Sequence, residues 1–455
     1  MRRRIEEEQR QEYVAMGPAE RVPAANASLP HSPSQVTLTS ETANTESPPV
    51  PPWTIVLLVA ATFGVGMAMV VPMTYSLAVR LDMLAPGRAD ILGMMFGIGS
   101  AVTLVVAPLT GILSDRTRSR FGRRRPFTVA GLVVGAASVA VMATAPNIWV
   151  LTMGWVLSTV GWGTAGASVG NWQADRLPAS QRGKVSGLTN LMMQISPVVG
   201  ILLVAPLRGE PFLVFAIPAA VAVVLIGLFV AFAPEADSRS VRHSERLTPG
   251  AVLKSYLFRP KDSPDFAWNW LGRFIFFLGL TSTTSFSVYF YSQRLDLALP
   301  DVAGVMALTS ALSVGTATLG SIGVGWLSDR TARRRPFILL GTLVFATGSI
   351  ISAFAGDLAS IIVGTLVSSL GIASFSSVGQ ALVLDVLPDR ERQAGRYMAI
   401  NMFAQKIPGV IAPVCAPLLL LIGGGEQNFT ALYLSTALLS AIGGILIATR
   451  VKGVR

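Results

Sequence analysis

Two acidic residues with matching neighbours are candidates for switchable ion pairs. Asp115 lies in the run Gly-Ile-Leu-Ser-Asp-Arg-Thr, and Asp329 lies in the run Gly-Trp-Leu-Ser-Asp-Arg-Thr. Each run is followed by Arg-Arg-Arg-Pro-Phe, which ends at Phe127 in one copy and at Phe337 in the other. A carboxylate at a helix end accepts hydrogen bonds from a neighbouring helix N-terminus and pairs with arginine. These residues therefore predict electrostatic rather than catalytic chemistry.

Two further motifs are duplicated. The pattern Asp-x-Leu-Pro-x-x-x-Arg begins at Asp175 and again at Asp385, and the pattern Asn-x-x-x-Gln-x-x-Pro begins at Asn190 and again at Asn401. The four repeated blocks keep their order, with offsets of 210 to 214 residues. The sequence therefore predicts two related halves, each with one network of charged residues. The alternative for the loop charges is that they are simply solvated.

Residues for other kinds of chemistry are scarce. One cysteine, Cys415, and two histidines, His31 and His243, leave no set for a metal site or a histidine-based catalytic centre. The chain also lacks the Gly-x-x-x-x-Gly-Lys-Ser/Thr loop that nucleotide hydrolysis would require. We therefore expect no catalytic residues, no metal and no cofactor, and a protein that is not an enzyme.

The composition indicates a membrane protein. Of 455 residues, 51% are hydrophobic and 13% are charged, which is about half the usual charged fraction of roughly 25%. The net charge is +11, but the basic residues are scattered between long apolar runs rather than gathered in one patch, which argues against a nucleic-acid partner. The bilayer is the partner that this composition predicts.

Twelve apolar runs reach the length of about 20 residues that a membrane span needs. The predicted fold class is an all-α polytopic membrane protein, with 12 transmembrane helices in two pseudo-symmetric six-helix bundles. The runs cover approximately residues 53–80, 89–113, 127–145, 148–171, 183–206, 211–232, 268–291, 302–327, 337–355, 358–381, 396–422 and 428–449.

The runs also set the domain boundaries and the orientation. We expect a disordered tail at 1–52, bundles at 53–232 and 268–449, a linker at 233–267 and a C-terminal segment at 450–455. No apolar run precedes residue 53, so the first span is expected to act as an uncleaved anchor. With the N-terminus inside, 30 of 36 Lys and Arg residues lie on the inner side, which predicts a cell-membrane protein with both termini cytoplasmic.

With these repeats, the chain resembles carriers of the major facilitator superfamily over roughly residues 53–449. The loop from Asp115 to Phe127 is most similar to that of the glycoside–pentoside–hexuronide cation symporters, which include the sucrose–proton symporters. The resemblance implies the major facilitator fold and transport by alternating access.

The resemblance also implies a gating role for the duplicated charges, whose contacts in the family latch the cytoplasmic side in one state and break in the other. The alternative is an incidental aspartate in a basic loop. The predicted gating residues are Asp115, Arg116, Arg123, Asp175, Arg182, Asp329, Arg330, Asp385 and Arg392.

In the family, the first, fourth, seventh and tenth helices line a central cavity. Hydroxyl, amide and aromatic side chains there suit a neutral polyhydroxylated ligand. The alternative for each serine or threonine is interhelical packing, and for the Asn–Gln pairs it is structural hydrogen bonding inside the bundles. The predicted substrate-binding residues are Trp162, Asn171, Asn190, Gln194, Thr283, Ser285, Tyr289, Ser376, Gln380, Asn401 and Gln405.

Lys406 is the predicted coupling residue. It lies about ten residues, or roughly 15 Å, into its span, where an ionisable group usually faces the bundle interior. Arg273, about five residues into the predicted seventh span, is expected to extend to the membrane surface instead. The alternative for Lys406 is an ammonium satisfied by carbonyls and water, with no role in coupling.

We therefore predict a monomeric transporter that takes up a sugar or glycoside with protons. No Asp or Glu lies near the middle of a span, in contrast to the carboxylates that such symporters commonly use. A rival is an exporter of drugs or metabolites with the same fold, favoured by Met67, Met69 and Met73. A second rival, a membrane-embedded enzyme or receptor, would need a catalytic constellation or a soluble domain, and the sequence offers neither.

Overall fold

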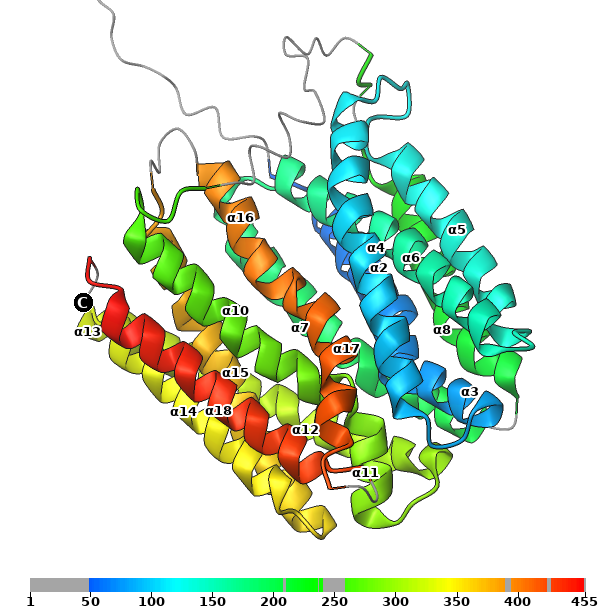
Figure 1. Cartoon of the computed structure of the whole chain (residues 1–455). Helices are drawn as coiled ribbons and strands as arrows, with labels where there is room; N and C mark the ends of the chain where they lie inside the picture. Colours follow the sequence, from blue (N-terminus) through cyan, green and yellow to red (C-terminus); the bar gives the residue numbers. More distant parts are fainter. Residues whose placement is uncertain are drawn as a thin grey trace, which may run out of the picture. The chain divides into compact units, whose positions relative to one another are not determined.

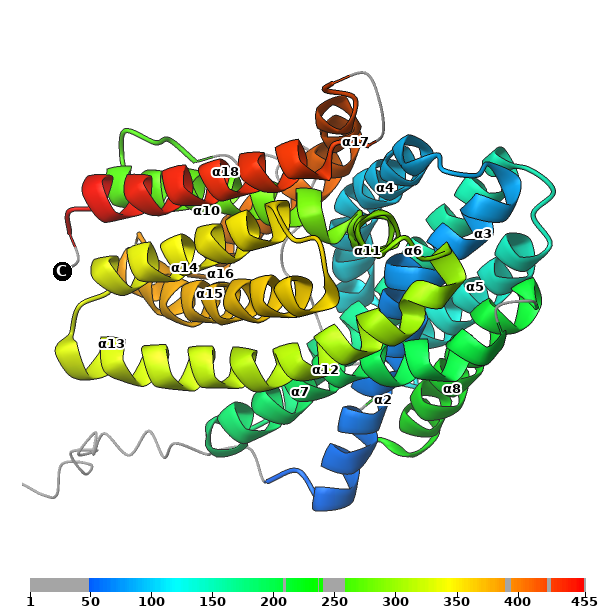
Figure 2. The same cartoon turned by 90° about the horizontal axis from the view of Figure 1, so that it is seen from below.

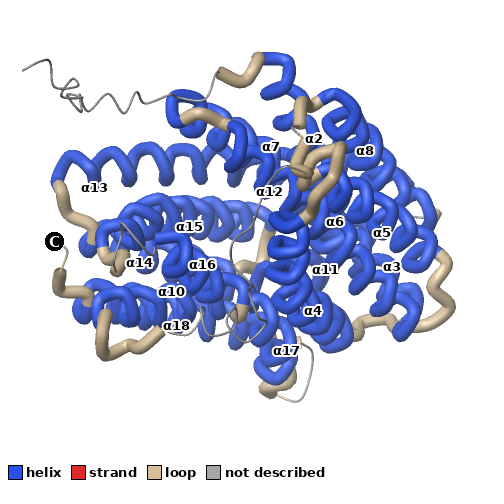
Figure 3. The backbone as a smooth tube through the Cα atoms, turned by 90° about the horizontal axis from the view of Figure 1, so that it is seen from above, coloured by secondary structure: helices blue, strands red, loops and turns tan. Residues whose placement is uncertain are grey.

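A computed structural model describes residues 49–207, 210–235, 237–239, 258–388, 394–423 and 427–453. All of them belong to one compact unit, Ser47–Arg455. Most of the predicted tail at 1–52 and of the predicted linker at 233–267 lies outside these residues. Figure 3 shows that the described part of the chain is helical, with no strand in it.

The first half consists of helices joined by short loops. Proline at the first positions of α2, α5 and α8 fixes the backbone angle φ without removing a needed hydrogen bond, and the Asn147 side chain caps α6. The elements are α2 (Pro52–Val71), the π-helical turn η2 (Pro72–Ser76), α3 (Leu77–Leu84), α4 (Ala89–Arg116), α5 (Arg125–Ala143), α6 (Ile148–Arg176), α7 (Ala179–Val204), η3 (Ala205–Leu207) and α8 (Pro211–Phe232).

The second half follows the same order. Asp357 caps α15 through a reciprocal pair of hydrogen bonds with Ser360. The elements are α10 (Pro264–Thr284), α11 (Ser287–Leu295), η4 (Leu299–Val302), α12 (Ala303–Leu319), the π-helical turn η5 (Gly320–Val324), α13 (Gly325–Thr331), α14 (Arg335–Ala353), α15 (Leu358–Asp385), α16 (Ala394–Lys406), α17 (Pro408–Leu420) and α18 (Phe429–Arg450).

The helices reproduce the predicted spans. Eleven described helical segments are long and apolar enough to cross a membrane, and the bent pair α10–α11 makes twelve if it is one span. This pair bends by 49° between Thr284 and Ser287. The predicted span at 396–422 runs through α16 and α17, which meet at Ile407, where Pro408 cannot donate a backbone hydrogen bond to the preceding turn.

Glycine lets helices within each half approach closely. A Cβ atom on Gly161 of α6 would lie 2.3 Å from the backbone nitrogen of Gly135 in α5, and one on Gly371 of α15 would lie 2.4 Å from that of Phe345 in α14. Equivalent helix pairs therefore pack alike in the two halves. Figure 2 shows the grouping, with α5, α6 and α8 together and α10, α14, α15 and α18 together.

The two halves meet at the end that lies away from Asp115 and Asp329. A Cβ atom on Gly93 of α4 would lie 2.1 Å from the carbonyl oxygen of Pro413 in α17. At the same end, the Tyr75 hydroxyl donates to the carbonyl of Pro300 at 2.9 Å. Toward the other end, the ribbons of α4 and α16 diverge (Figure 1).

Candidate functional site

A buried arginine joins three helix ends in the first half. Arg124, the residue before α5, has an 8% exposed side chain, and its Nη2 lies 2.6 Å from Oδ1 of Asp115 at the end of α4. Its Nε lies 3.0 Å from Oδ2 of Asp175 near the end of α6, and its Nη1 donates to Oγ of Ser114 at 3.0 Å. One guanidinium therefore clamps the ends of α4, α5 and α6 together.

The second half contains the same clamp. Arg334, the residue before α14, pairs with Asp329 of α13 and with Asp385 of α15, where Nε and Oδ2 are 3.3 Å apart. Its Nη1 also donates to Oγ of Ser328 at 3.2 Å. Burial lowers the pKa of Arg334, but the hydrogen bonds to Asp329 and Asp385 outweigh it and leave the pKa above its ordinary value. The duplication therefore extends from sequence to geometry.

The centres of both clamps were not among the gating residues predicted from the sequence. The predicted residue Arg123 makes a single 2.8 Å contact with Asp175, whereas Arg124 is the buried centre. Arg334 is the corresponding centre of the second clamp. Each centre is the second arginine of its Arg-Arg-Arg-Pro-Phe block and the residue just before the helix that the block begins.

Two other predicted gating residues make contacts outside the clamps. Arg182 donates from Nε to the carbonyl of Leu177 at 2.8 Å instead of joining Asp175. Arg330 lies over the ring of Trp326, with Cζ 5.2 Å from its centroid. Arg116 is the last residue of α4, and Arg392 lies outside the described residues.

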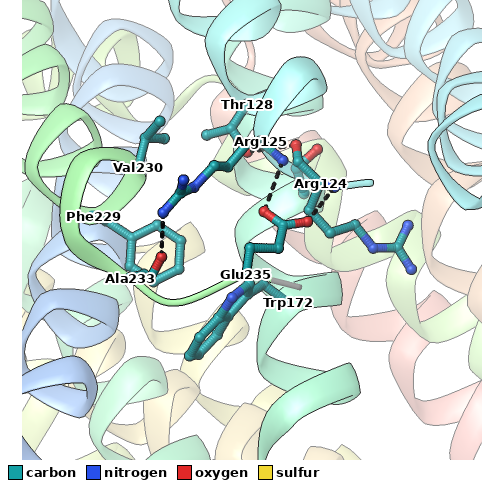
Figure 4. Close-up of a pocket in the computed structure, with 9 residues that line it drawn as sticks. Arg124, Arg125, Thr128, Trp172, Phe229, Val230, Ala233 and Glu235 are labelled. Carbon is teal, nitrogen blue, oxygen red and sulfur yellow. Dashed lines mark hydrogen bonds between the residues drawn. The ribbon is translucent and has the colours of Figure 1, made fainter. Parts of the chain in front are cut away.

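Glu235 adds a contact to the first clamp that the sequence did not reveal. Its carboxylate accepts hydrogen bonds from the backbone N–H groups of Arg124 at 2.6 Å and of Arg125 at 3.1 Å (Figure 4). The Arg125 side chain donates in turn to the carbonyl of Ala233. Gly122, with φ of +87°, allows this approach, since a Cβ atom there would lie 2.3 Å from Glu235. The segment after α8 is thereby tied to the start of α5.

A polar cavity of about 430 Å³ lies between α6 and α7, near the clamp end of the first half. Its size is in the range of small-molecule sites. Of the predicted residues it includes Asn190 and Arg182, while Gln173 and Ser186 form a 3.1 Å hydrogen bond in its wall. The lining residues are Gly170, Gln173, Ala174, Leu177, Arg182, Ser186, Thr189 and Asn190.

The break between α10 and α11 places two unpartnered hydroxyl groups in the interior. Ser285 and Tyr289 are 6% and 5% exposed, and neither Oγ nor Oη has a hydrogen-bond partner in the part of the chain that the structure describes. Thr283 is also buried, but its hydroxyl donates to the carbonyl of Leu280 at 3.1 Å. Ser285 and Tyr289 therefore each carry a hydroxyl group whose hydrogen-bonding capacity is unused by the described residues.

Trp162 does not belong to this group, contrary to the prediction. It is 1% exposed, and a Cβ atom on Gly135 of α5 would lie 2.6 Å from its ring, so it packs inside the first half. The periodicity of an apolar helix could not separate this packing face from a cavity face.

The remaining predicted binding residues differ in environment. Asn401 is buried, with no partner for its Oδ1 within the described ranges, whereas its sequence counterpart Asn190 is exposed. The two Asn–Gln motifs therefore have different environments in the structure. The two amide side chains of the α7 motif do not face a closed bundle interior, contrary to the prediction. Gln194 and Gln380 are exposed, while Asn171, Ser376 and Gln405 are half-buried.

For the two basic residues that were expected within spans, the structure shows the opposite of the predicted exposure. Lys406 is exposed rather than buried, and it is the last residue of α16. Arg273 is 1% exposed rather than directed to the membrane surface. The reason is that α10 begins at Pro264, four residues before the predicted start, so Arg273 lies deeper in the helix.

The described residues contain no group of three or more His, Cys, Asp or Glu side chains that could hold a metal ion. What these residues can do is hydrogen-bond a solute and tie helix ends together. The arrangement offers binding and motion rather than covalent chemistry.

Comparison with known proteins identifies the family. The sequence profile of the Major Facilitator Superfamily matches residues 56–322 and 302–453. The tetracycline resistance protein, class C, of Escherichia coli is 32% identical over 168 residues. The matched region covers 36% of this chain and 41% of that relative. The isoprimeverose transporter of Lactiplantibacillus pentosus is 24% identical over 75% of this chain and 74% of its own length.

Solved structures show the same fold. A mutant form of the nucleoside transporter NupG superposes with a TM-score of 0.72 at 12% identity, covering 88% of this chain and 100% of that one. A D-xylose–proton symporter superposes with a TM-score of 0.68 at 16% identity, and the match covers 88% of this chain and 98% of the symporter. The chain is therefore a multi-pass membrane transporter rather than an enzyme, and it belongs to the Major Facilitator Superfamily.

Proposed function

We propose that this protein is a secondary active transporter that takes up a sugar or glycoside with protons by alternating access. The observation that carries the proposal is the distribution of contacts. One arginine ties three helix ends within each half, while the halves contact each other at the opposite end. Such halves can rock as rigid bodies about a site between them.

The orientation follows from the distribution of charge. Of the 36 Lys and Arg residues, 30 fall on the side of the clamps in the predicted topology. We therefore assign the clamp end to the cytoplasm. In this orientation the cavity that contains Asn190 lies on the cytoplasmic side, and the contact between Tyr75 and Pro300 closes the outer side.

A sugar is favoured by the polar cavity and by the isoprimeverose transporter, which shares most of its length with this chain. Hydroxyl and amide groups such as Tyr289 and Asn190 can bind a polyhydroxylated solute without ion pairs.

A second candidate is an exporter of an apolar solute. An apolar groove of about 370 Å³ between α2, α7 and α8 favours it, as do the tetracycline resistance proteins among the relatives. Met67, which suggested this function from the sequence, is fully buried and does not line the groove. The groove is lined by Ile55, Val56, Val59, Ala60, Phe63, Leu188, Met192 and Leu225.

Transport by proteoliposomes tests the proposal. Labelled isoprimeverose should accumulate when an inward proton gradient is imposed, and a protonophore should abolish the accumulation. Asn190→Ala should slow uptake, whereas Gly163→Ala, where an added Cβ meets nothing within 4 Å, should not. Movement of tetracycline without movement of the sugar would establish the second candidate instead.

A further inference from the structure

The guanidinium of Arg273 is almost completely buried, and no residue that the structure describes forms an ion pair with it. The side chain is 1% exposed, and neither Nε nor Nη1 has a hydrogen-bond partner among the residues that the structure describes. Arg273 is the tenth residue of α10, about 14 Å along the helix. A charged group at such depth is costly, and such groups usually mark the path of a solute.

Asn269 lies one turn earlier on the same face of α10 and is equally unsatisfied. It is 0% exposed, and neither its amide oxygen nor its amide nitrogen has a partner within the described ranges. A buried amide without hydrogen bonds also costs free energy. The two side chains therefore offer several unused N–H donors at one place in the second half.

The surroundings hold the guanidinium but do not neutralise it. Its Cζ lies 5.6 Å from the ring centroids of both Phe277 and Phe375, a separation at which the ring faces attract a cation. Gly379 of α15 leaves the necessary room, because a Cβ atom there would lie 2.5 Å from Nη1. The next residue of α15, Gln380, is exposed.

The fold does not require an arginine at this place. Gly64 of α2 packs against Ala222 of α8 in the first half, as Gly279 of α10 packs against Thr436 of α18 in the second. When Gly64 is matched to Gly279, the residue that corresponds to Arg273 is Leu58, which is 0% exposed. A hydrocarbon side chain therefore fills the equivalent position of the duplicated fold.

We propose that Arg273 and Asn269 form a binding site for an oxyanion, a carboxylate or phosphate group carried by the transported solute. The planar fork of N–H groups on a guanidinium matches two oxygens of such a group, and the amide adds a further donor. The inference rests on the proposed transport function in naming the solute as the ligand. It narrows the proposed substrate class from any sugar or glycoside to one that carries an anionic group.

The test measures binding by the purified full chain in a neutral detergent without added lipid. Thermal unfolding is followed against D-gluconate, inorganic phosphate and the neutral control D-glucose, with ionic strength held constant by chloride. The wild type should be stabilised by gluconate or phosphate and not by glucose. Arg273→Met should raise the dissociation constant at least about 30-fold, as expected when one partner of a buried charged pair is truncated.

Two variants keep the charge and separate binding from folding. Arg273→Lys should bind the oxyanion more weakly because it lacks the fork, and Gly379→Ala should do so because it displaces Nη1. The matched controls are Arg294→Met, whose guanidinium already donates to Ala353 and Thr430, and Gly315→Ala, which meets nothing within 4 Å. Both controls should bind like the wild type.

Two results would overturn the site. The first is that neither anion stabilises the wild type. The second is that the anions stabilise Arg273→Lys and Gly379→Ala as much as they stabilise the wild type. A protein that accumulates isoprimeverose but fails this test keeps the transport function and loses the oxyanion site. A protein that binds gluconate through Arg273 but moves no solute keeps the site and loses the transport function.

Discussion

Arg124 Nε lies 3.0 Å from Asp175 Oδ2, and 51 residues separate the two in the chain. Arg334 and Asp385 repeat this pair with the same separation of 51 residues, at 3.3 Å. The identical spacing means that the two helices after the arginine, together with the turn between them, have kept their combined length in both halves. The four-residue difference between the halves lies before the arginine, in the loop after Asp115.

Replacing Arg124 should destabilise the protein more than replacing its neighbour. Arg124→Gln removes hydrogen bonds to two carboxylates from a buried position, and we expect the free energy of unfolding to fall by roughly 2–3 kcal/mol. Arg123→Gln removes one contact from a side chain that is 35% exposed and should cost less than about 1 kcal/mol. Melting temperatures in detergent compare the variants, and equal losses would show that Arg124 is not the centre of the clamp.

Neutralising Asp115 should slow transport without unfolding the protein. The Asp115 side chain is 51% exposed, so Asp115→Asn should change stability little, yet we expect turnover in proteoliposomes to fall at least about tenfold. Asp329→Asn should have the same effect more mildly, given the shorter loop of the second half. Wild-type turnover in Asp115→Asn would rule out a gating role for this residue.

The Tyr289 hydroxyl should contribute to solute binding, whereas Trp162 should not. Tyr289→Phe removes one unpartnered hydroxyl and keeps the ring, so the lost hydrogen bond should weaken binding by about 1 kcal/mol, or roughly fivefold. Trp162→Phe alters packing against Gly135 and should lower the melting temperature while leaving affinity unchanged. If equilibrium binding were weakened in Trp162→Phe and unchanged in Tyr289→Phe, Trp162 rather than Tyr289 would belong to the solute site.

Lys406 remains the predicted coupling residue. Lys406→Met should abolish proton-coupled accumulation but leave counterflow exchange intact, because the lysine is exposed and its loss should not disturb packing. Uptake measured between pH 5 and pH 8 tests whether Lys406 couples transport to protons. A variant that accumulates solute at the wild-type rate over this range would place coupling elsewhere.

The orientation can be tested with single cysteines. In a Cys415→Ala background, Arg118→Cys at the clamp end and Glu210→Cys at the other end should react with an impermeant maleimide from opposite sides of the membrane. Only Glu210→Cys should be labelled in intact cells. Labelling of Arg118→Cys from outside would reverse the orientation.

The sequence predicted the spans well because an apolar run of about 20 residues has few alternatives to a membrane helix. It also found Asp115 and Asp329, since their neighbours are duplicated. It could not choose Arg124 from three consecutive arginines, because the rotation of the first turn of α5 decides which side chain points inward. Hydropathy could not reveal that Trp162 and Arg273 point into their bundles, because spans in a bundle are apolar on every face.

Pro408 leaves one hydrogen bond missing from the membrane span formed by α16 and α17. Pro408 has no backbone N–H to donate to the carbonyl of Ala404, whereas Ile407 still donates to Phe403 and Ile411 to Ile407, so the span is continuous across this point. On one side of it α17 packs against α4 at Gly93, and on the other side α16 is bonded to α10, where Trp270 donates to the carbonyl of Ile400 at 2.9 Å. A small bend at the missing bond would let α17 stay in contact with the first half while α16 moved with the second.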